Sequence, residues 1–367
     1  MALLDPDRLF PSDPATRRTA RHLYEGVAGL PIISPHGHTD PRWFAENERF
    51  PDPAQLFVTP DHYVFRMLCS QGVDLADLGV PRADGGPVET DGRKIWRLFA
   101  GHYHLFRGTP TRMWLDHSFE TLFGLTERLS AETADTYYDR IADRLASDEY
   151  RPRALFERFN IEVLSTTEGA LDDLKWHSMI AGSGWSGRVV TTYRPDTVID
   201  PEAAGFADNI EKFGQLTGCD TGTFEGYLDA HRVRRAFFQQ HGATASDHGH
   251  PTARTEDLPK AQAAALYARA VTGDLSAEEA DAFRGHMLTE MARMSLDDGL
   301  VLQIHAGSFR SHSPEILACF GRDKGFDIPV RTEYVRALKP LLDAVGLERN
   351  LTIILFTLDE TVYSREL

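Results

Sequence analysis

Cysteine is scarce in this sequence, and a membrane-spanning or leader segment is not evident. The 367 residues include three widely separated cysteines, Cys69, Cys219 and Cys319. An odd number at such spacing favours neither a disulfide framework nor a Cys-x-x-Cys zinc site. The first residues lack a basic, apolar leader, and no apolar run is long enough to cross a bilayer. We therefore expect a soluble protein of the reducing cytoplasm with no membrane partner.

Basic residues are also in short supply. Lys and Arg number 39 against 55 Asp and Glu, which gives a net charge of −16. An acidic surface of this kind repels nucleic acid, so we expect no nucleic-acid partner. If the substrate is itself an anion, arginines at the pocket must supply the local positive charge.

Several common catalytic motifs are absent from the sequence. There is no Gly-x-x-x-x-Gly-Lys-Ser/Thr loop, no Gly-x-Ser-x-Gly elbow, no His-Glu-x-x-His helix and no dinucleotide-binding fingerprint. These absences disfavour phosphate-loop, serine-hydrolase and zincin chemistry. We expect neither a nucleotide nor a redox cofactor.

What the sequence does contain is a series of short apolar runs, rich in β-branched residues, that end in polar residues. They read as buried parallel strands, and helical patterns lie between them, which is the alternation expected of an α/β protein. The strand-like runs are Pro31 to Asp40, Ile161 to Thr167, Arg188 to Asp196, Gly242 to His250, Val301 to Gly307 and Leu351 to Asp359. The helical patterns include Ala261 to Val271, Ser276 to Met294 and Thr332 to Val345.

In each strand-like run the apolar residues come first and the reactive side chains last. Barrel enzymes assemble their sites at the carboxyl ends of the strands, so this polarity predicts a TIM-type (β/α)8 barrel. We expect residues 1–40 to form an N-terminal segment and the first strand. Residues 41–150 are predicted to be a mainly helical insertion that hides the second strand, and residues 151–367 to be the remainder of the barrel. The eighth strand is missing from this count, which suggests a C-terminally truncated barrel.

His36-Gly37-His38 follows the first apolar run. The two-residue period of a strand would place both imidazoles on one face, and two neutral imidazoles suit a divalent metal such as zinc. Gly37 leaves room for the ion or for a neighbouring backbone. Solvated or ordinarily hydrogen-bonded histidines are the alternative, and we favour metal ligation.

Three further residues at strand ends can carry chemistry, and each has a structural alternative. His305 can be a metal ligand, a general acid or base, or a satisfied core histidine. Asp247, beside His248, can move a proton, but local sequence favours capping of the next helix. Arg194 can grip a carboxylate with its planar guanidinium, or can form a structural pair with Asp196.

The remaining histidines and the start of a predicted helix give weaker evidence for a functional site. The run from Asp61 to Arg66 mixes donors with an aromatic side chain and reads by itself as a solvated helix face. We treat the other histidines considered as structural, namely His102, His104, His117, His177 and His312.

Taken together, several stretches resemble the uronate isomerase family, a branch of the amidohydrolase superfamily. They are SPHGHTDPRWFAEN, DHYVFRML, STTEGALDDLKWH, TYRPD, SDHGH and LQIHAGSFRSHSPE. Each stretch alone is modest evidence for the family, but six stretches in the family's order are specific for it. The resemblance implies interconversion of D-glucuronate with D-fructuronate, and of D-galacturonate with D-tagaturonate.

The resemblance also implies roles for individual residues. His36 and His38 would hold a divalent metal, expected to be zinc; Asp247, His305 and Tyr63 would be catalytic; and His62, Arg194 and Arg310 would bind the substrate. In the family an Asp-x-Arg pair on the eighth strand completes the site, and this sequence shows none. Asp359 also ends a strand-like run but lacks the arginine two places on.

The implied reaction removes a proton from C2 of the open-chain sugar acid and returns it at C1 through an enediol. One rival is metal-assisted hydrolysis, which a lysine on the fourth strand would favour; the run read as that strand, Val189 to Arg194, contains none. Another rival is a non-catalytic sugar-acid binder. We expect a homo-oligomer, since barrels of this size often associate.

Overall fold

The computed structural model describes residues 3–366, and its internal contacts divide the chain into two compact units. The helical unit comprises Met1–Ile32, Glu46–Glu162 and Ser311–Asp327. The sheet unit comprises Ile33–Ala45, Val163–Arg310 and Ile328–Leu367.

The helices of the helical unit begin at strong start signals. Asp52, Asp61 and Asp91 each accept hydrogen bonds from the first backbone N–H groups of the helix that follows. Such N-caps satisfy donors that have no partner within the helix. The elements of this unit are α1 (Pro14–Glu25), α3 (Pro53–Phe57), α4 (His62–Cys69), η1 (Leu75–Leu78), α5 (Gly92–Gly101), η2 (Tyr103–Phe106), α6 (Pro110–Phe123), α7 (Ala134–Leu145), η3 (Asp148–Tyr150), α8 (Pro152–Arg158) and α15 (Pro314–Phe320).

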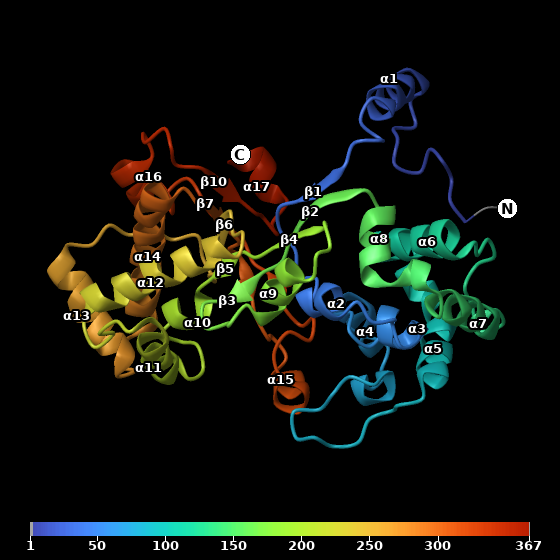
Figure 1. The fold of residues 1–367 in the computed structure, drawn as a ribbon, viewed down its shortest axis with the longest axis horizontal. Helices are drawn as coiled ribbons and strands as arrows, with labels where there is room; N and C mark the ends of the chain where they lie inside the picture. Colours follow the sequence, from blue (N-terminus) through green and yellow to red (C-terminus); the bar gives the residue numbers. More distant parts are fainter. Residues whose placement is uncertain (1–2, 367) are drawn as a thin grey trace. The chain divides into compact units, whose positions relative to one another are not determined.

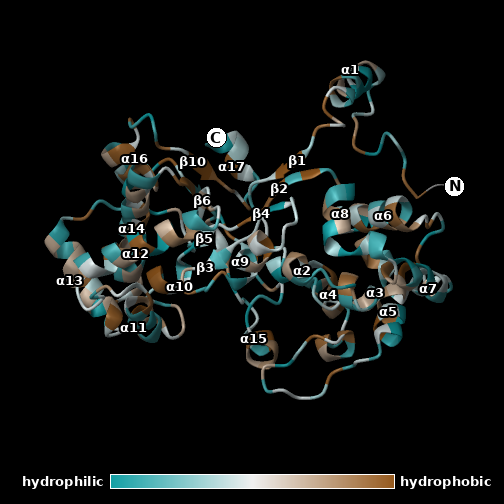
Figure 2. Ribbon diagram, viewed as in Figure 1, coloured by the Kyte–Doolittle hydropathy of each residue, from teal (hydrophilic) through white to brown (hydrophobic). Residues whose placement is uncertain are grey.

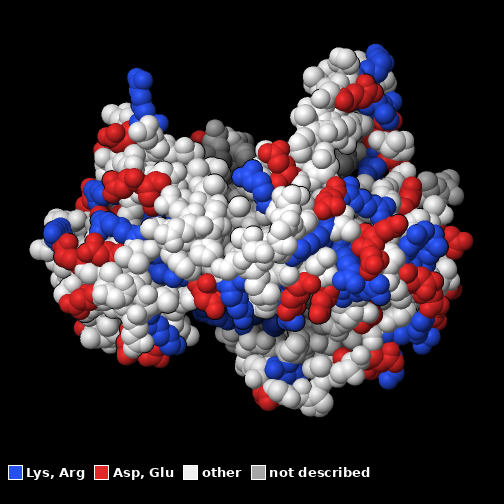
Figure 3. Space-filling model, in the orientation of Figure 1, with Lys and Arg blue, Asp and Glu red and all other residues white. Residues whose placement is uncertain are grey.

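The core of the helical unit is aromatic. Trp96, Phe99, Tyr103 and Phe119 are fully buried and pack in tilted and edge-to-face arrangements, which aromatic rings favour. On the face drawn in Figure 3, acidic and basic side chains are interspersed over α6 and α7. The apolar side chains are thus turned inward and the charges outward.

The strand that we expected to be hidden in residues 41–150 is not there. The structure describes these residues as helices, 3-10 helices and connecting turns. The prediction was wrong because it placed the second barrel strand within this insertion, whereas these helices bury their apolar faces against one another and need no sheet.

Parallel strands form the centre of the sheet unit. The strand order is β1-β2-β4 in one sheet and β10-β7-β6-β5-β3 in the other, and the register given for each strand pair within the larger sheet is parallel. Figure 1 shows β6, β7 and β10 side by side. The strands are β1 (Ile32–Ser34), β2 (Ile161–Ser165), β3 (Glu168–Gly169), β4 (Arg188–Val190), β5 (Tyr193–Arg194), β6 (Ala245–His248), β7 (Val301–Ile304) and β10 (Ile353–Leu355), with the antiparallel pair β8 (Ser308–Phe309) and β9 (Ile328–Pro329).

Strands therefore occur in all six stretches where the sequence predicted them, and the α/β class with parallel sheets is confirmed. The described pairings form two sheets whose outer strands include β1 and β10, and these two strands are not paired with each other in residues 3–366. In Figure 2 the strand β10 is coloured mostly as a hydrophobic segment.

Helices follow the strands of the sheet unit. They are α2 (Pro41–Glu46), α9 (Lys175–Gly182), α10 (Asp196–Ile199), α11 (Phe206–Thr217), α12 (Phe224–Gln240), α13 (Lys260–Val271), α14 (Ala277–Asp298), α16 (Lys339–Val345) and α17 (Thr361–Arg365). The helices expected from Ala261 and from Ser276 are confirmed, and Ser276 forms a capping box with Glu279. The last predicted helix is shorter than expected, because α16 starts only at Lys339 beside Pro340, a residue favoured in the first helical turn.

Among residues 3–366, no helix combines the length and apolar character that a bilayer crossing requires.

Candidate active site in the sheet unit

The paired histidines lie in the loop after β1 rather than on the strand itself. β1 ends at Ser34, so the period of two residues does not extend to His36 and His38, and that part of the prediction was wrong. Their rings nevertheless lie 5.1 Å apart, edge to face. A Cβ at Gly37 would approach the Ser165 carbonyl oxygen to 3.2 Å, so glycine allows this loop to run close to the end of β2.

Gln303 holds the ring of His36. Its side-chain oxygen lies 3.2 Å from His36 Nδ1, and its side-chain nitrogen donates to the Pro35 carbonyl over 3.3 Å. Because the amide oxygen can only accept, His36 Nδ1 carries the proton and Nε2 presents its lone pair. An outer hydrogen bond of this kind typically orients a metal-binding histidine.

His36, Asp247 and His305 bring donor atoms together. One ligand atom from each lies within 4.8 Å of those of the other two. His36 Nε2, Asp247 Oδ1 and His305 Nδ1 are buried and make no hydrogen bond within the described residues. Buried polar atoms are normally satisfied, so three unsatisfied donor atoms facing one another fit a divalent cation. His38 is not a member of this group, although its ring borders that of His36.

Arg194 joins this group to a second carboxylate. Its Nη1 lies 3.1 Å from Asp247 Oδ2, and its Nε donates to Asp196 Oδ2 over 2.8 Å. Asp196 also accepts from the Gly249 backbone N–H. Both interpretations of Arg194 thus have support, because the structural pair with Asp196 exists and the guanidinium also reaches the reactive cluster.

Burial sets the protonation of the cluster. It lowers the pKa of His38 and that of His305 to about 4, helped by the positive charge of Arg194. Burial raises the pKa of Asp247 above its ordinary value, against the opposing effect of Arg194. At neutral pH the two imidazoles are therefore neutral, which is the form that ligates metals or accepts protons.

Asp247 does not cap a helix, contrary to the alternative that local sequence favoured. Its side chain is fully buried, and the next helix, α13, begins only at Lys260. Asp359, by contrast, accepts from the backbone of Thr332 and Thr361 and stabilises a local turn.

Of the other candidate residues, two belong to the helical unit and one to the sheet unit. Arg310 is exposed after β8, and its charge contributes to the low pKa of His305. His62 and Tyr63 open α4 in the helical unit, where their rings lie 4.4 Å apart. Burial lowers the pKa of His62, and half of Tyr63 is exposed. The structure therefore brings His36, His38, Arg194, Asp247 and His305 together within one unit.

Sequence reasoning missed Gln303 and Glu168. Gln303 lies on β7, two residues before His305. The two-residue period of a strand could have indicated that both side chains point to the same face. Glu168 is buried at β3, accepts from Thr191 and lies 3.7 Å from His177. Burial raises the pKa of Glu168 to about 7. His177, treated as structural from sequence, also bonds Thr166 over 2.9 Å.

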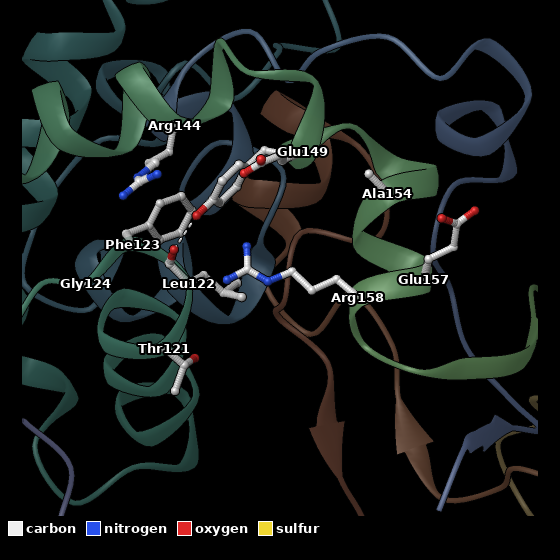
Figure 4. Close-up of a pocket in the computed structure, with 10 residues that line it drawn as sticks. Thr121, Leu122, Phe123, Gly124, Arg144, Glu149, Ala154, Glu157 and Arg158 are labelled. Atoms are coloured by element: carbon white, nitrogen blue, oxygen red, sulfur yellow. Dashed lines mark hydrogen bonds between the residues drawn. The ribbon is translucent and has the colours of Figure 1, made fainter. Parts of the chain in front are cut away.

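A hollow of about 570 Å³ lies within the helical unit and contains none of the candidate residues. Arg158 extends toward Leu122, while Glu157 points away from it (Figure 4). Arg144 and Glu149 also line this hollow, so its charged groups are of mixed sign. It does not collect the convergent polar groups that mark a ligand site.

Comparison with known proteins agrees with the motifs in the sequence. A uronate isomerase of Rhizobium meliloti (strain 1021) is 66% identical over 365 residues, covering 100% of this chain and 78% of the relative. The glucuronate isomerase family model matches residues 14–365. The chain belongs to the uronate isomerase family. A crystal structure of glucuronate isomerase from Caulobacter crescentus superposes with a TM-score of 0.96 at 58% identity, covering 100% of this chain and 77% of that one.

A more distant uronate isomerase structure, from Thermotoga maritima, has a TM-score of 0.89 at 26% identity over 99% of this chain and 77% of that one. Family membership agrees with the lack of a lysine on the fourth strand. Because no strand lies in residues 41–150, the run from Val189 to Arg194 is the third strand-like run and not the fourth. The fourth contains β6, Ala245–His248, and it also lacks lysine.

Proposed function

We propose that the protein interconverts D-glucuronate and D-fructuronate, and D-galacturonate and D-tagaturonate, as an aldose-ketose isomerase. The observation that carries the proposal is a buried carboxylate, Asp247, held between Arg194 and neutral imidazoles in a chain of the uronate isomerase family. The reaction moves one proton between C2 and C1 and another between O2 and O1, through an enediol. It requires a base, a group that stabilises the developing oxyanion and an anchor for the carboxylate.

Asp247 is the proposed base. Burial raises the pKa of Asp247, so this carboxylate binds a proton more tightly than an exposed one does, which suits a general base. Its Oδ1 has no hydrogen bond within the described residues and lies 3.8 Å from His305 Nδ1. The proton taken from C2 would be held on Asp247, exchange there in part with solvent, and be returned at C1.

Arg194 is the proposed anchor of the substrate carboxylate, with His62 and Arg310 as further binding residues and Tyr63 as a catalytic hydrogen-bond partner. A substrate carboxylate would compete with Asp247 for the guanidinium. When Asp247 loses part of this pairing, its pKa rises further. Binding of the anion would thereby make the base stronger at the moment when it is needed.

His36 and His38 are the proposed metal-binding pair, and zinc is the ion that suits two neutral imidazoles and a nearby carboxylate. When bound, such an ion would polarise the substrate carbonyl oxygen. His305 is then either a further ligand or the acid that protonates that oxygen. Metal analysis of His305→Gln separates these roles, since only a ligand changes the retained metal.

The proposal extends to architecture and setting. Reactive residues at the ends of parallel strands support a TIM-type barrel of the amidohydrolase kind. The cysteine usage supports a reducing cytoplasm. Barrels of this size often associate, which supports a homo-oligomer that light scattering would detect.

The test is to incubate full-length, metal-replete protein with D-glucuronate in deuterated water. We expect the ketose product and exchange of the C2 proton. A folded, metal-replete preparation that neither forms ketose nor exchanges the C2 proton would refute the proposal, while hydrolysis of an amide or phosphoester would favour the hydrolase alternative.

A further inference from the structure

A second group of metal-ligating side chains lies in the sheet unit. It consists of Asp196 at the start of α10, His248 at the end of β6 and His250 two residues later. One donor atom from each lies within 4.8 Å of those of the other two. The group shares no member with His36, Asp247 and His305.

The two histidines of this group are buried and unsatisfied. His248 is fully buried and His250 is 3% exposed. His250 Nδ1 and Nε2, and His248 Nδ1, make no hydrogen bond within residues 3–366. Buried polar atoms rarely lack partners, so three such nitrogens beside a carboxylate call for a ligand.

Strand geometry separates this group from the first one. Successive side chains on a strand point to opposite faces, and His248 Nε2 bonds Ser246 Oγ over 3.2 Å, two residues back along β6. Asp247, between them, faces Arg194 and His305 instead. The Ser246 bond leaves His248 Nδ1 as the ligating atom and orients its ring, as outer hydrogen bonds do at metal sites.

We propose that Asp196, His248 and His250 form a second binding site for a borderline divalent metal ion of the zinc class. Two imidazoles and one carboxylate are a common zinc donor set, whereas magnesium and calcium prefer oxygen ligands. The site shares no ligand with the group of His36, Asp247 and His305, and it is linked to that group through Arg194.

A simple ion pair explains the group less well. Protonated His250 would have to donate an N–H to Asp196, and no such hydrogen bond exists, since both ring nitrogens are unpartnered. The side chain of Asp196 is 23% exposed.

The charged groups near the site include two arginines and four carboxylates. Arg194 forms ion pairs with both Asp196 and Asp247. Arg284, whose charge interacts with His250, forms ion pairs with Asp200 and Glu202. A bound cation would fix Asp196, and Asp196 in turn holds Arg194 Nε. The second site would thereby set the position of the arginine that reaches Asp247.

The test uses zinc alone and a protein from which the first site has been removed. His36→Ala/His38→Ala protein is loaded with Zn²⁺, freed of excess ion and analysed for metal by mass spectrometry. We expect about one zinc ion per chain. Adding His250→Ala, or Asp196→Asn, should remove it. The matched control is His231→Ala, since His231 is equally buried and also has an unpartnered nitrogen but belongs to neither group.

Folding is checked by near-ultraviolet circular dichroism and by melting. Zinc should raise the melting temperature of the His36→Ala/His38→Ala protein, magnesium should not, and the shift should disappear with His250→Gln. A folded His36→Ala/His38→Ala protein that retains no zinc would overturn the proposal, as would undiminished zinc after His250→Ala. If these variants do not fold, the unsubstituted protein decides: about two zinc ions per chain support the second site, and about one contradicts it.

Discussion

The two units of this molecule bury different kinds of side chain. Among residues 3–366, the fully buried side chains of the helical unit are apolar or aromatic, while all buried polar and charged residues, from Ser165 to Thr332, belong to the sheet unit. Buried ionisable groups destabilise a protein unless they are paired, and they are retained where chemistry needs them. The comparison indicates that the helical unit's core serves stability and that the sheet unit's core carries function.

The largest effect on stability should come from the helical unit. Trp96 is fully buried, and its ring N–H donates to the Ala134 carbonyl over 2.9 Å. Trp96→Ala should lower the free energy of unfolding by about 3–5 kcal/mol. Urea unfolding measures the loss, and activity per folded molecule should stay unchanged. Trp114→Ala, at a site 59% exposed in the same unit, is the control and should change stability little.

The sheet unit should instead show stability that depends on pH. Burial raises the pKa of Glu168 to about 7 from a model-compound value of 4.5. Between these two pKa values the folded protein keeps a proton on Glu168 that the unfolded protein has released. The stabilisation that this proton gives is complete below the lower pKa and is lost as pH rises through the upper one. It amounts to about 3 kcal/mol.

Urea unfolding from pH 4 to pH 8 measures this contribution. The stability of the unsubstituted protein relative to Glu168→Gln should fall across that window. Glu157→Gln, at an exposed position of the helical unit, should give a curve parallel to that of the unsubstituted protein. Parallel curves for Glu168→Gln as well would show that this carboxyl does not titrate as described.

Arg194→Met tests the proposed anchor. Loss of a charge-assisted, two-pronged contact to the substrate carboxylate should lower kcat/KM about a hundredfold. Steady-state kinetics with glucuronate measure the effect. Arg232→Met, at a half-exposed position on α12, should leave kcat/KM unchanged. Equal kinetics for the two variants would exclude Arg194 from substrate binding.

A smaller effect is expected at Gly249. A Cβ there would lie 2.0 Å from Arg194 Nη2 and 2.8 Å from Asp196 Oδ2, so alanine must displace the guanidinium. Gly249→Ala should lower kcat/KM about tenfold, because a displaced binding group orients the substrate poorly. Gly182→Ala meets no atom within 4 Å and serves as the control. Unchanged kinetics in Gly249→Ala would mean that the position of Arg194 is not critical.

Sequence patterns predicted the parallel strands and most of the cluster, because apolar runs that end in His, Asp or Arg place those side chains at one edge of a parallel sheet. The His36 loop was predicted less well. Pro35 and Gly37 end the strand early, and the ring positions then depend on Gln303, a contact 267 residues away along the chain. Such long-range contacts leave no periodic signal.

The capping alternative for Asp247 failed for a related reason. Local sequence cannot show that the next helix starts thirteen residues later, at Lys260. The strand predicted in residues 41–150 but not found there shows a second limit of sequence patterns. Amphipathic helices can form a core of their own, and a pattern that predicts helices does not say whether a sheet lies beneath them.

The most direct test of the central claim compares the unsubstituted protein with Asp247→Asn in deuterated water. With D-glucuronate as substrate and nuclear magnetic resonance as the readout, the unsubstituted protein should exchange the C2 proton while forming ketose. Asp247→Asn should fold, bind glucuronate and lose exchange by about a thousandfold. Exchange by folded Asp247→Asn at a rate near that of the unsubstituted protein would contradict the account, because the buried carboxylate would then not move the proton.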